Sequence, residues 1–314
     1  MKIACLQHAP KVAEIEDNID LIERILDKKD VDTLDLLVLP ELALTGYNFK
    51  SRSEILRYVE PSNASLSVAW AKKAALKYDC IVIVGYPEQA VSTTKKDGSA
   101  DLFNSAIIVD GDGEIVGNYR KNHLYYTDET WAEEGKGGFY SGHLPGIGQS
   151  ALGICMDLNP YKFEAPWTAY EFASHAKDTE AQVVILTMAW NTMEPAETFL
   201  EQPDEPDMET LSYWLSRLQP LLGADARRET IVVFANRAGR EGDATYAGTS
   251  AVVGIQGNDI RVYGMVGRGE ERLLVVDTDL PAYAKLRFVA KEKVDSPGSS
   301  PANDEEAEVG EQES

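Results

Sequence analysis

The stretch QSALGICMDLNPY, residues 149–161, is the point from which we interpret the rest of the chain. A short apolar run at residues 151–154 leads directly to Cys155, and a polar segment with a proline follows. This pattern predicts a buried strand that ends in a turn with the cysteine at its tip. A thiol in that position is a candidate nucleophile if a base and a cation lie close to it. Packing as a small apolar core residue is the alternative, and this segment alone leaves it open.

The composition indicates a globular protein with an acidic surface. The chain has 314 residues, of which 44% are hydrophobic, and its formal net charge is −22. Such a charge argues against nucleic acid and anionic membranes as partners. Residues 292–314 hold eight acids and one base, together with proline, glycine and serine. We therefore expect one domain at residues 1–290 and a disordered acidic tail at residues 291–314.

The three cysteines, Cys5, Cys80 and Cys155, have no metal-ligand spacing and do not make a disulfide framework. The four histidines do not form a metal-ligand pattern either, so we expect neither a metal nor another cofactor. The first residues lack the features of a signal or transit peptide, and no apolar run approaches the roughly 18 residues of a membrane span. A reducing, cytoplasmic location is the simplest interpretation.

Short apolar runs alternate with helical patterns along the chain. We expect helices at residues 12–28, 63–78, 170–177 and 208–222. We expect strands at residues 2–7, 34–39, 80–84, 102–109, 115–119, 151–154, 182–188, 230–235, 249–254 and 272–276. The turn DGDG at residues 110–113 predicts a hairpin, and a second hairpin is expected around residues 256–258. The pattern predicts a layered α/β domain with mixed sheets and outer helices.

Three residues of complementary chemistry each follow a predicted strand: Glu41, Lys121 and Cys155. A carboxylate beside a thiol can take its proton and return it to a leaving amine. A lysine ammonium can stabilise the oxyanion of a tetrahedral intermediate, together with the backbone N–H of Met156. The set predicts acyl transfer from an amide or nitrile carbon through a thioester. Taken singly, each residue also has a purely structural explanation, as a turn cap, a solvated lysine or a core cysteine.

Three sequence blocks carry a resemblance to a known family: LVLPELALTGYNF at residues 37–49, GNYRKNHLYYTDE at residues 117–129 and GICMDLNPYKFEAPW at residues 153–167. In that order they resemble the signature blocks of the nitrilase, or carbon–nitrogen hydrolase, superfamily, and NRAGREGDATYAGTS at residues 236–250 resembles a later block.

The resemblance implies a four-layer α-β-β-α sandwich, as a monomer or homodimer. It also implies that Glu41 is the general base, Lys121 the oxyanion stabiliser and Cys155 the nucleophile. The family carries a second glutamate on the loop after the lysine, and Glu129 occupies that place in this sequence.

Within the superfamily, the stretches YYTDETWAEE, MDLNPYKFEAPW and LTMAW resemble fungal enzymes that deamidate asparagine or glutamine at protein N-termini. The implied partners are protein or peptide N-termini that begin with either residue, upstream of arginylation in the N-degron pathway. Two alternatives stay open: an enzyme of the same superfamily that acts on a small free amide or carbamoyl group, and a non-catalytic module that binds N-termini.

An enzyme of this kind must bind a free α-ammonium next to the target carboxamide, which favours a buried acid near the nucleophile. Asp157 is the first candidate, followed by Asp128 and Glu129, although Asp157 could equally stabilise a turn. Tyr47 and Trp190 are candidates for the pocket walls, with plain packing as the alternative. The acidic, proline-containing residues 194–207 predict a long loop that could form a lid or rim.

Overall fold

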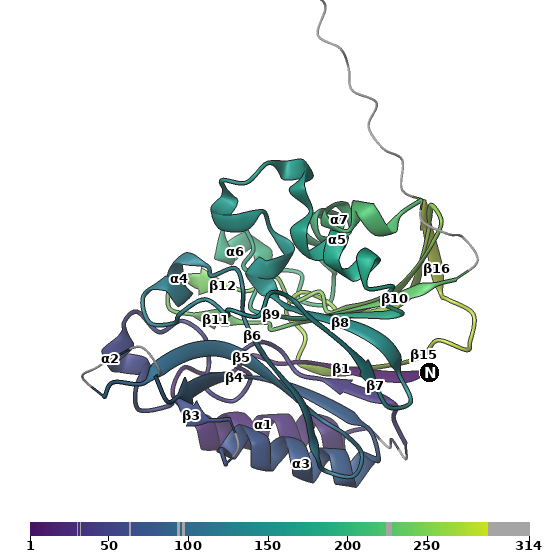
Figure 1. The fold of residues 1–314 in the computed structure, drawn as a ribbon. Coiled ribbons are helices and arrows are strands. Elements are labelled where there is room, and N and C mark those ends of the chain that lie inside the picture. The colour runs from purple at the N-terminus through teal and green to yellow at the C-terminus, as the bar shows by residue number, and fades with distance from the viewer. Residues whose placement is uncertain are drawn as a thin grey trace, which may run out of the picture.

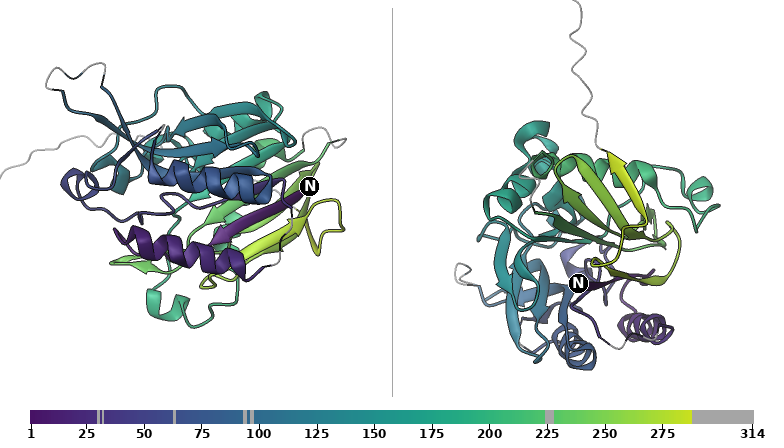
Figure 2. Two further views of the ribbon diagram at one scale, coloured as in Figure 1. Left: turned by 90° about the horizontal axis from the view of Figure 1, so that it is seen from below. Right: turned by 90° about the vertical axis from the view of Figure 1, so that its right-hand side faces the viewer.

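Two mixed β-sheets lie face to face between two layers of helices (Figures 1 and 2). The computed structural model describes residues 1–29, 31, 33–62, 64–92, 95, 98–223 and 228–287. Its layers run α-β-β-α, which confirms the predicted four-layer sandwich. The predicted acidic tail at residues 291–314 lies outside the described residues.

The first sheet has the strand order β15-β1-β2-β4-β5-β6, with β3 paired to β4. Strands β1 and β2 are parallel, as are β2 and β4, whereas β15 pairs with β1 in the antiparallel direction. The bounds of its strands are β1 (Lys2–Gln7), β2 (Leu36–Val38), β3 (Glu60–Pro61), β4 (Ile81–Ala90), β5 (Asp101–Val109), β6 (Ile115–Arg120) and β15 (Arg272–Asp277).

The second sheet has the order β16-β14-β13-β10-β9-β8-β7, and its central strands β8, β9 and β10 are parallel. A separate hairpin is formed by β11 (Arg240–Glu241) and β12 (Ala244–Thr245). The bounds of the second sheet are β7 (Tyr140–Leu144), β8 (Gly148–Ile154), β9 (Val183–Met188), β10 (Thr230–Asn236), β13 (Ala251–Gln256), β14 (Asp259–Met265) and β16 (Ala284–Arg287).

Helices α1 (Ile15–Asp27) and α3 (Leu66–Tyr78) cover the outer face of the first sheet, and α5 (Glu171–Asp178) and α7 (Met208–Arg217) cover the second (Figures 1 and 2). Short helices α2 (Arg52–Ile55), α4 (Tyr126–Glu129) and α6 (Ala196–Phe199) lie in the connections. Within the described residues, no helix has both the length and the apolarity that crossing a lipid bilayer requires.

Both faces of the central strands are buried, which explains their continuous apolar sequences. In β1, Ile3 and Cys5 belong to the core that includes the space between the sheets, whereas Ala4 and Leu6 pack toward the helices. This alternation follows from the two-residue period of a strand. A tightly packed interior on both sides fixes the position of each strand end, and the residues that follow those ends form the site.

Two helices begin later than the sequence pattern predicted. The first starts at Ile15 instead of residue 12, because the buried Asn18 side chain binds the backbone N–H and C=O of Lys11 and so stabilises a turn there. The second, α3, begins at Leu66, where the Ser65 hydroxyl accepts a hydrogen bond from the Val68 N–H and caps the helix. Residue 63, where the predicted helix would begin, lies outside the described residues.

Candidate active site

Glu41, Lys121 and Cys155 come from three separate segments that meet between the two sheets. Glu41 follows β2, and Lys121 directly follows β6 in the first sheet, whereas Cys155 directly follows β8 in the second. Both β2 and β8 have parallel neighbours, and parallel strands place the residues that follow them at one edge of a sheet. The nucleophile candidate and the two charged candidates therefore come from opposite sheets.

The Lys121 ammonium lies between two carboxylates. Its Nζ is 2.6 Å from Glu41 Oε1 and 2.6 Å from Asp128 Oδ2, and all three side chains are fully buried. Burial acts to lower the pKa of Lys121, but the charges of Asp128 and Glu41 outweigh it and raise that pKa above its ordinary value. Lys121 is therefore a permanent cation, and one of its three N–H donors is not used by these two contacts.

Glu41 has one engaged and one free oxygen. Oε1 accepts hydrogen bonds from Lys121 and from Asn104 Nδ2, each at 2.6 Å, whereas the buried Oε2 has no partner among the described residues. Burial raises the pKa of Glu41, and the nearby Asp128 adds to this effect while Lys121 opposes it. A buried carboxylate oxygen without a partner is uncommon and points to a function. Here it offers a position for a transferred proton.

Cys155 sits in a strained backbone conformation. Its φ of 43° lies in the left-handed region, and a 3₁₀ helix, Cys155–Leu158, begins with it. Strain of this kind in a non-glycine residue concentrates at functional sites. Burial and the charge of Glu41 raise the pKa of the thiol above its ordinary value, against the opposing effect of Lys121. A raised pKa favours the protonated thiol, so a neighbouring base would assist its attack.

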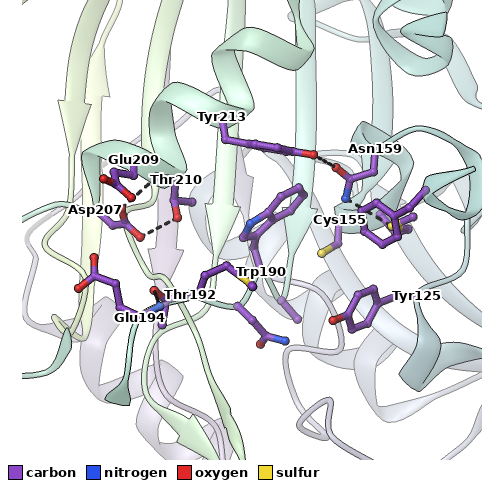
Figure 3. Close-up of a pocket in the computed structure, with 15 residues that line it drawn as sticks. Tyr125, Cys155, Asn159, Trp190, Thr192, Glu194, Asp207, Glu209, Thr210 and Tyr213 are labelled. Carbon is purple, nitrogen blue, oxygen red and sulfur yellow. Dashed lines mark hydrogen bonds between the residues drawn. The ribbon is translucent and has the colours of Figure 1, made fainter. Parts of the chain in front are cut away.

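A cavity of about 380 Å³ opens onto Cys155 and Met156. Figure 3 shows Cys155 and Tyr125 on one side of Trp190, and the carboxylates of Glu194, Asp207 and Glu209 on the other. No lysine, arginine or histidine is among the described residues that line it, so its charged side chains are all acidic. The lining also includes aromatic and amide side chains: Phe163, Tyr213, Asn159 and Asn191.

The loop after Lys121 requires a correction to the sequence prediction. Glu129 is exposed and lines a separate surface hollow with Glu133 and Lys162. Its neighbour Asp128 is buried and binds Lys121 instead. Successive residues of a helical turn point in directions about 100° apart, so only one of two adjacent acids can face the lysine. The second carboxylate of the cluster is therefore Asp128.

Asp157 does not line the cavity, contrary to its prediction as the first candidate for binding an α-ammonium. Its Oδ1 accepts hydrogen bonds from the backbone N–H groups of Asn122 and His123, at 3.1 and 2.8 Å. Its Oδ2 accepts from the Ile154 N–H and the Tyr119 hydroxyl, at 2.8 and 2.7 Å. This buried carboxylate accepts four hydrogen bonds and joins the turn after Cys155 to the segment after Lys121. It therefore stabilises a turn, which was the alternative to binding an α-ammonium.

The remaining predicted site residues are divided between cavity and core. Trp190 lines the cavity, and its backbone N–H donates to Asn236 Oδ1 at 2.7 Å. Tyr47 is only 2% exposed and lies against Lys121, with Nζ 5.7 Å from the ring centroid. Both carboxylate oxygens of the buried Asp128 already accept hydrogen bonds, Oδ1 from Asn104 and Oδ2 from Lys121, so it is not placed to bind a substrate cation.

Sequence reasoning missed Asn104, which orients Glu41, and the three acids of the cavity. A signal for Asn104 was available, since Asn104 and Ser105 interrupt an otherwise apolar strand that is buried on both faces. Glu194 and Asp207 belong to the loop predicted as a rim, and Glu209 lies in the first turn of α7. No sequence pattern identified which of the many acids in this stretch line the cavity.

Comparison with known proteins agrees with this geometry. A family model described as carbon-nitrogen hydrolase matches residues 2–159. The chain is 32% identical over 290 residues to the protein N-terminal amidase of Schizosaccharomyces pombe, a match that covers 88% of this chain and 98% of that protein. It is 34% identical over 211 residues to the protein N-terminal amidase of Saccharomyces cerevisiae, covering 60% of this chain but only 45% of that protein.

Solved structures show the same fold. A crystal structure of N-terminal amidase with a Gln-Gly peptide has a TM-score of 0.77 at 23% identity, and it covers 88% of this chain and 96% of that chain. A crystal structure of N-terminal amidase with an Asn-Glu-Ala peptide has the same TM-score and identity, and it covers 92% of this chain and 98% of that chain.

Proposed function

The chain belongs to the carbon–nitrogen hydrolase family, and from this premise we propose that it deamidates asparagine or glutamine at the N-terminus of proteins and peptides. The products are ammonia and a chain that begins with aspartate or glutamate. The observation that supports the proposal most directly is a cysteine, backed by a buried Glu–Lys pair, at one side of a cavity whose charged groups are all acidic.

In the proposed reaction, Oε2 of Glu41 takes the proton of the Cys155 thiol as the sulfur attacks the carboxamide carbon. The unpartnered state of Oε2 leaves it available for this role. Glu41 then donates the proton to the departing nitrogen, and ammonia leaves behind a thioester on Cys155. The same carboxylate then takes a proton from a water molecule, whose oxygen attacks the thioester carbon. The C–S bond breaks, Glu41 returns the proton to the Cys155 sulfur, and the new side-chain carboxyl group is released.

The negative oxygen of each tetrahedral intermediate needs donors that are already in place. Lys121 has one N–H beyond those that bind Glu41 and Asp128, and the Met156 backbone N–H lies next to the nucleophile. We assign the oxyanion to these two donors. The contact between Asp128 and Lys121 keeps the ammonium in place while Glu41 changes its protonation state.

The acids of the cavity support recognition of a free N-terminus. An α-ammonium carries the only charge that an N-terminal asparagine or glutamine presents, and Glu194, Asp207 and Glu209 complement it. Asp207 already accepts hydrogen bonds from the Thr210 N–H and hydroxyl, whereas Glu209 has no hydrogen bond or ion pair within the described part of the chain. Glu209 is therefore our first choice for the residue that binds the α-ammonium.

The relatives support the same substrate class. The fission yeast protein that matches along 98% of its length is a protein N-terminal amidase, and structures with this fold are complexes with peptides that begin with Gln or Asn. A new N-terminal aspartate or glutamate is a substrate for arginylation, which places the proposed reaction in the N-degron pathway. The partners we propose are thus protein or peptide N-termini that bear Asn or Gln.

The deciding experiment compares peptides that begin with Asn or Gln, each with a free and an acetylated N-terminus, by measuring ammonia release. We expect turnover of the free peptides only. Equal release from free and acetylated peptides would show a general amidase for small amides, and no release from any of them would contradict the proposal.

Glu209→Gln should raise KM for the free peptides about fivefold with little change in kcat, as loss of an exposed charge-assisted contact implies. Glu201→Gln, an exposed acid outside the cavity lining, is its control.

A non-catalytic module that binds N-termini is tested by Cys155→Ser. This variant should bind the free peptides with unchanged affinity and release no ammonia. Mass spectrometry of the wild-type protein during turnover should detect an acyl adduct on Cys155. An adduct on the buried Cys5 or Cys80, or binding by the wild type without turnover, would rule out the proposed mechanism.

A further inference from the structure

A fully buried arginine of the second sheet contacts the turn that carries Glu41 in the first. Arg237 directly follows β10, and its Nη2 donates hydrogen bonds to the carbonyl oxygens of Glu41 and Leu42, at 2.8 and 3.0 Å. Arg237 does not line the cavity, and both of its terminal nitrogens are bound to protein groups, which argues against a direct contact with substrate. Its contacts are to the backbone beside the proposed base.

Side chains donate to the carbonyl groups of this turn, whose backbone is irregular. Leu42 has a φ of 45°, in the left-handed region, which is strained for a leucine. Three consecutive carbonyl groups point to side chains: those of Glu41 and Leu42 accept from Arg237, and that of Ala43 lies 2.9 Å from His8 Nε2. The Leu42 carbonyl also accepts from the Gly46 N–H at 3.2 Å, so it is the Glu41 carbonyl that relies on Arg237. Buried carbonyls need donors, so the backbone at Glu41 would have to rearrange without Arg237.

Glu241 extends the same contact to the other end of the segment. Its Oε1 is 2.7 Å from Arg237 Nη1. Its Oε2 accepts from the backbone N–H groups of Tyr47 and Asn48, at 3.0 and 2.9 Å, and from the Tyr246 hydroxyl at 2.7 Å. The buried Arg237–Glu241 pair therefore holds carbonyls at the start of residues 41–48 and amides at the end.

We propose that Arg237, with Glu241 as its partner, is a positioning residue that aligns the Glu41 carboxylate of the first sheet with the Cys155 thiol of the second. The two reacting groups are carried by different sheets, so their separation depends on contacts that cross between them. Arg237 makes such a contact at the base itself. A buried ion pair contributes little to stability compared with apolar packing of the same volume. The positioning of Glu41 gives this pair a function that apolar packing would not supply.

The inference rests on the proposed roles of Glu41 and Cys155, but its main test does not need the substrate. Alkylation of Cys155 by iodoacetamide, followed by mass spectrometry, reports how readily Glu41 accepts the thiol proton. A wrong substrate assignment leaves this rate unaffected. A wrong role for Arg237 leaves it the same in the variants as in the wild type.

The test compares Arg237→Lys and Arg237→Gln with the wild type. A misplacement of about 1 Å costs on the order of 10²-fold in rate, so kcat for Arg237→Gln should fall about 10²-fold and KM should change by less than about twofold. Lysine keeps the charge but cannot reach both carbonyls, so its kcat should fall about tenfold. The alkylation rate of Cys155 should also fall in both variants, and it should fall further in Arg237→Gln than in Arg237→Lys.

Glu60→Gln is the control for lost stability. Glu60 is a buried acid that accepts hydrogen bonds from the Ser67 N–H and hydroxyl in the first turn of α3, on the outer layer. This variant should unfold more easily and keep the wild-type kcat per folded molecule. If the Arg237 variants behave in the same way, or raise KM without lowering kcat, the proposal is wrong.

Glu241→Gln gives an independent test, because it keeps Arg237 and removes only the charge of its partner. We expect a lower kcat, a KM within about twofold of the wild type and slower alkylation of Cys155, because the guanidinium is no longer held on the two carbonyls. Wild-type values of kcat and alkylation rate for Glu241→Gln would overturn the proposal, whatever the Arg237 variants do.

Discussion

At the scale of single residues, the sequence was enough to select some residues of the candidate site but not to choose between adjacent acids. Glu41 and Cys155 were singled out because each follows a buried strand, where a polar side chain is costly unless it has a partner. Lys121 follows a hairpin strand, and the family resemblance joined it to the other two. The choice between the adjacent acids Asp128 and Glu129 could not be made in the same way. It depends on which side of one short helical turn packs against Lys121, and this is a property of the tertiary structure.

The pair Asp128 and Glu129 gives a matched comparison. Asp128→Asn removes one of the two negative charges that hold the Lys121 ammonium, so the lysine shifts toward Glu41 and weakens it as a base. We expect kcat for peptide deamidation to fall about 10²-fold. Glu129→Gln, on the exposed side of the same turn, should stay within about twofold of the wild type. Equal losses in both variants, or a larger loss for Glu129→Gln, would contradict the geometry.

The proposed base also fixes the pH dependence. Burial raises the pKa of Glu41 above its ordinary value of 4.5, although Lys121 opposes this, and the reaction needs the ionised form. Both kcat and kcat/KM should therefore fall as the pH drops through a value above 4.5. A second fall in kcat/KM alone is expected near pH 8, where the α-ammonium of the peptide loses its proton. Steady-state profiles from pH 4 to 9 test this, and an acid limb below pH 4.5 would argue against Glu41 as the base.

At the scale of elements, the strands that are buried on both faces were the easiest to identify from the sequence. The near-continuous apolar runs that became β4, β9 and β10 needed no knowledge of their neighbours. Helix starts were less predictable, since α1 begins where the Asn18 side chain binds the chain before it. Likewise, α6 lies inside residues 194–207, whose prolines and acids predicted only a loop.

The contact between β4 and the Glu41 turn leads to a prediction about one glycine. A Cβ added to Gly85 would lie 2.7 Å from Glu41 Cα and 2.7 Å from the Leu42 nitrogen. Gly85→Ala must push the turn away from the strand, so we expect a loss of about 1–3 kcal/mol in unfolding free energy and at least a tenfold lower kcat. Urea denaturation and the ammonia assay measure the two effects. Gly137→Ala, whose Cβ would meet nothing within 4 Å, is the control and should change neither.

At the scale of the whole molecule, the site lies at the interface between the two sheets. Asp157 connects the turn after Cys155 to the segment after Lys121, and Arg237 connects β10 to the turn of Glu41. Both charges are buried and bind backbone groups of the opposite sheet. The α-β-β-α arrangement could be predicted from the family resemblance, but these cross-sheet contacts join residues far apart in sequence and follow no periodicity. They show how segments of both sheets together position the residues of the candidate site.

If the interface between the sheets sets the geometry of the site, the core between the sheets should matter more for activity than the core under the helices. Ile107 and Ile108 are neighbours on β5 and are both fully buried, but Ile107 packs in the cluster under α1 and α3, whereas Ile108 packs in the cluster shared with the second sheet. Each change to alanine should lower the unfolding free energy by about 2–5 kcal/mol. Because a cavity between the sheets lets them move closer, Ile108→Ala should also lower kcat per folded molecule, by about threefold or more. Ile107→Ala should leave it near the wild-type value. Calorimetry and active-site titration of Cys155 supply the two quantities, and an equal kcat for both variants would mean that the spacing of the sheets does not control the reaction.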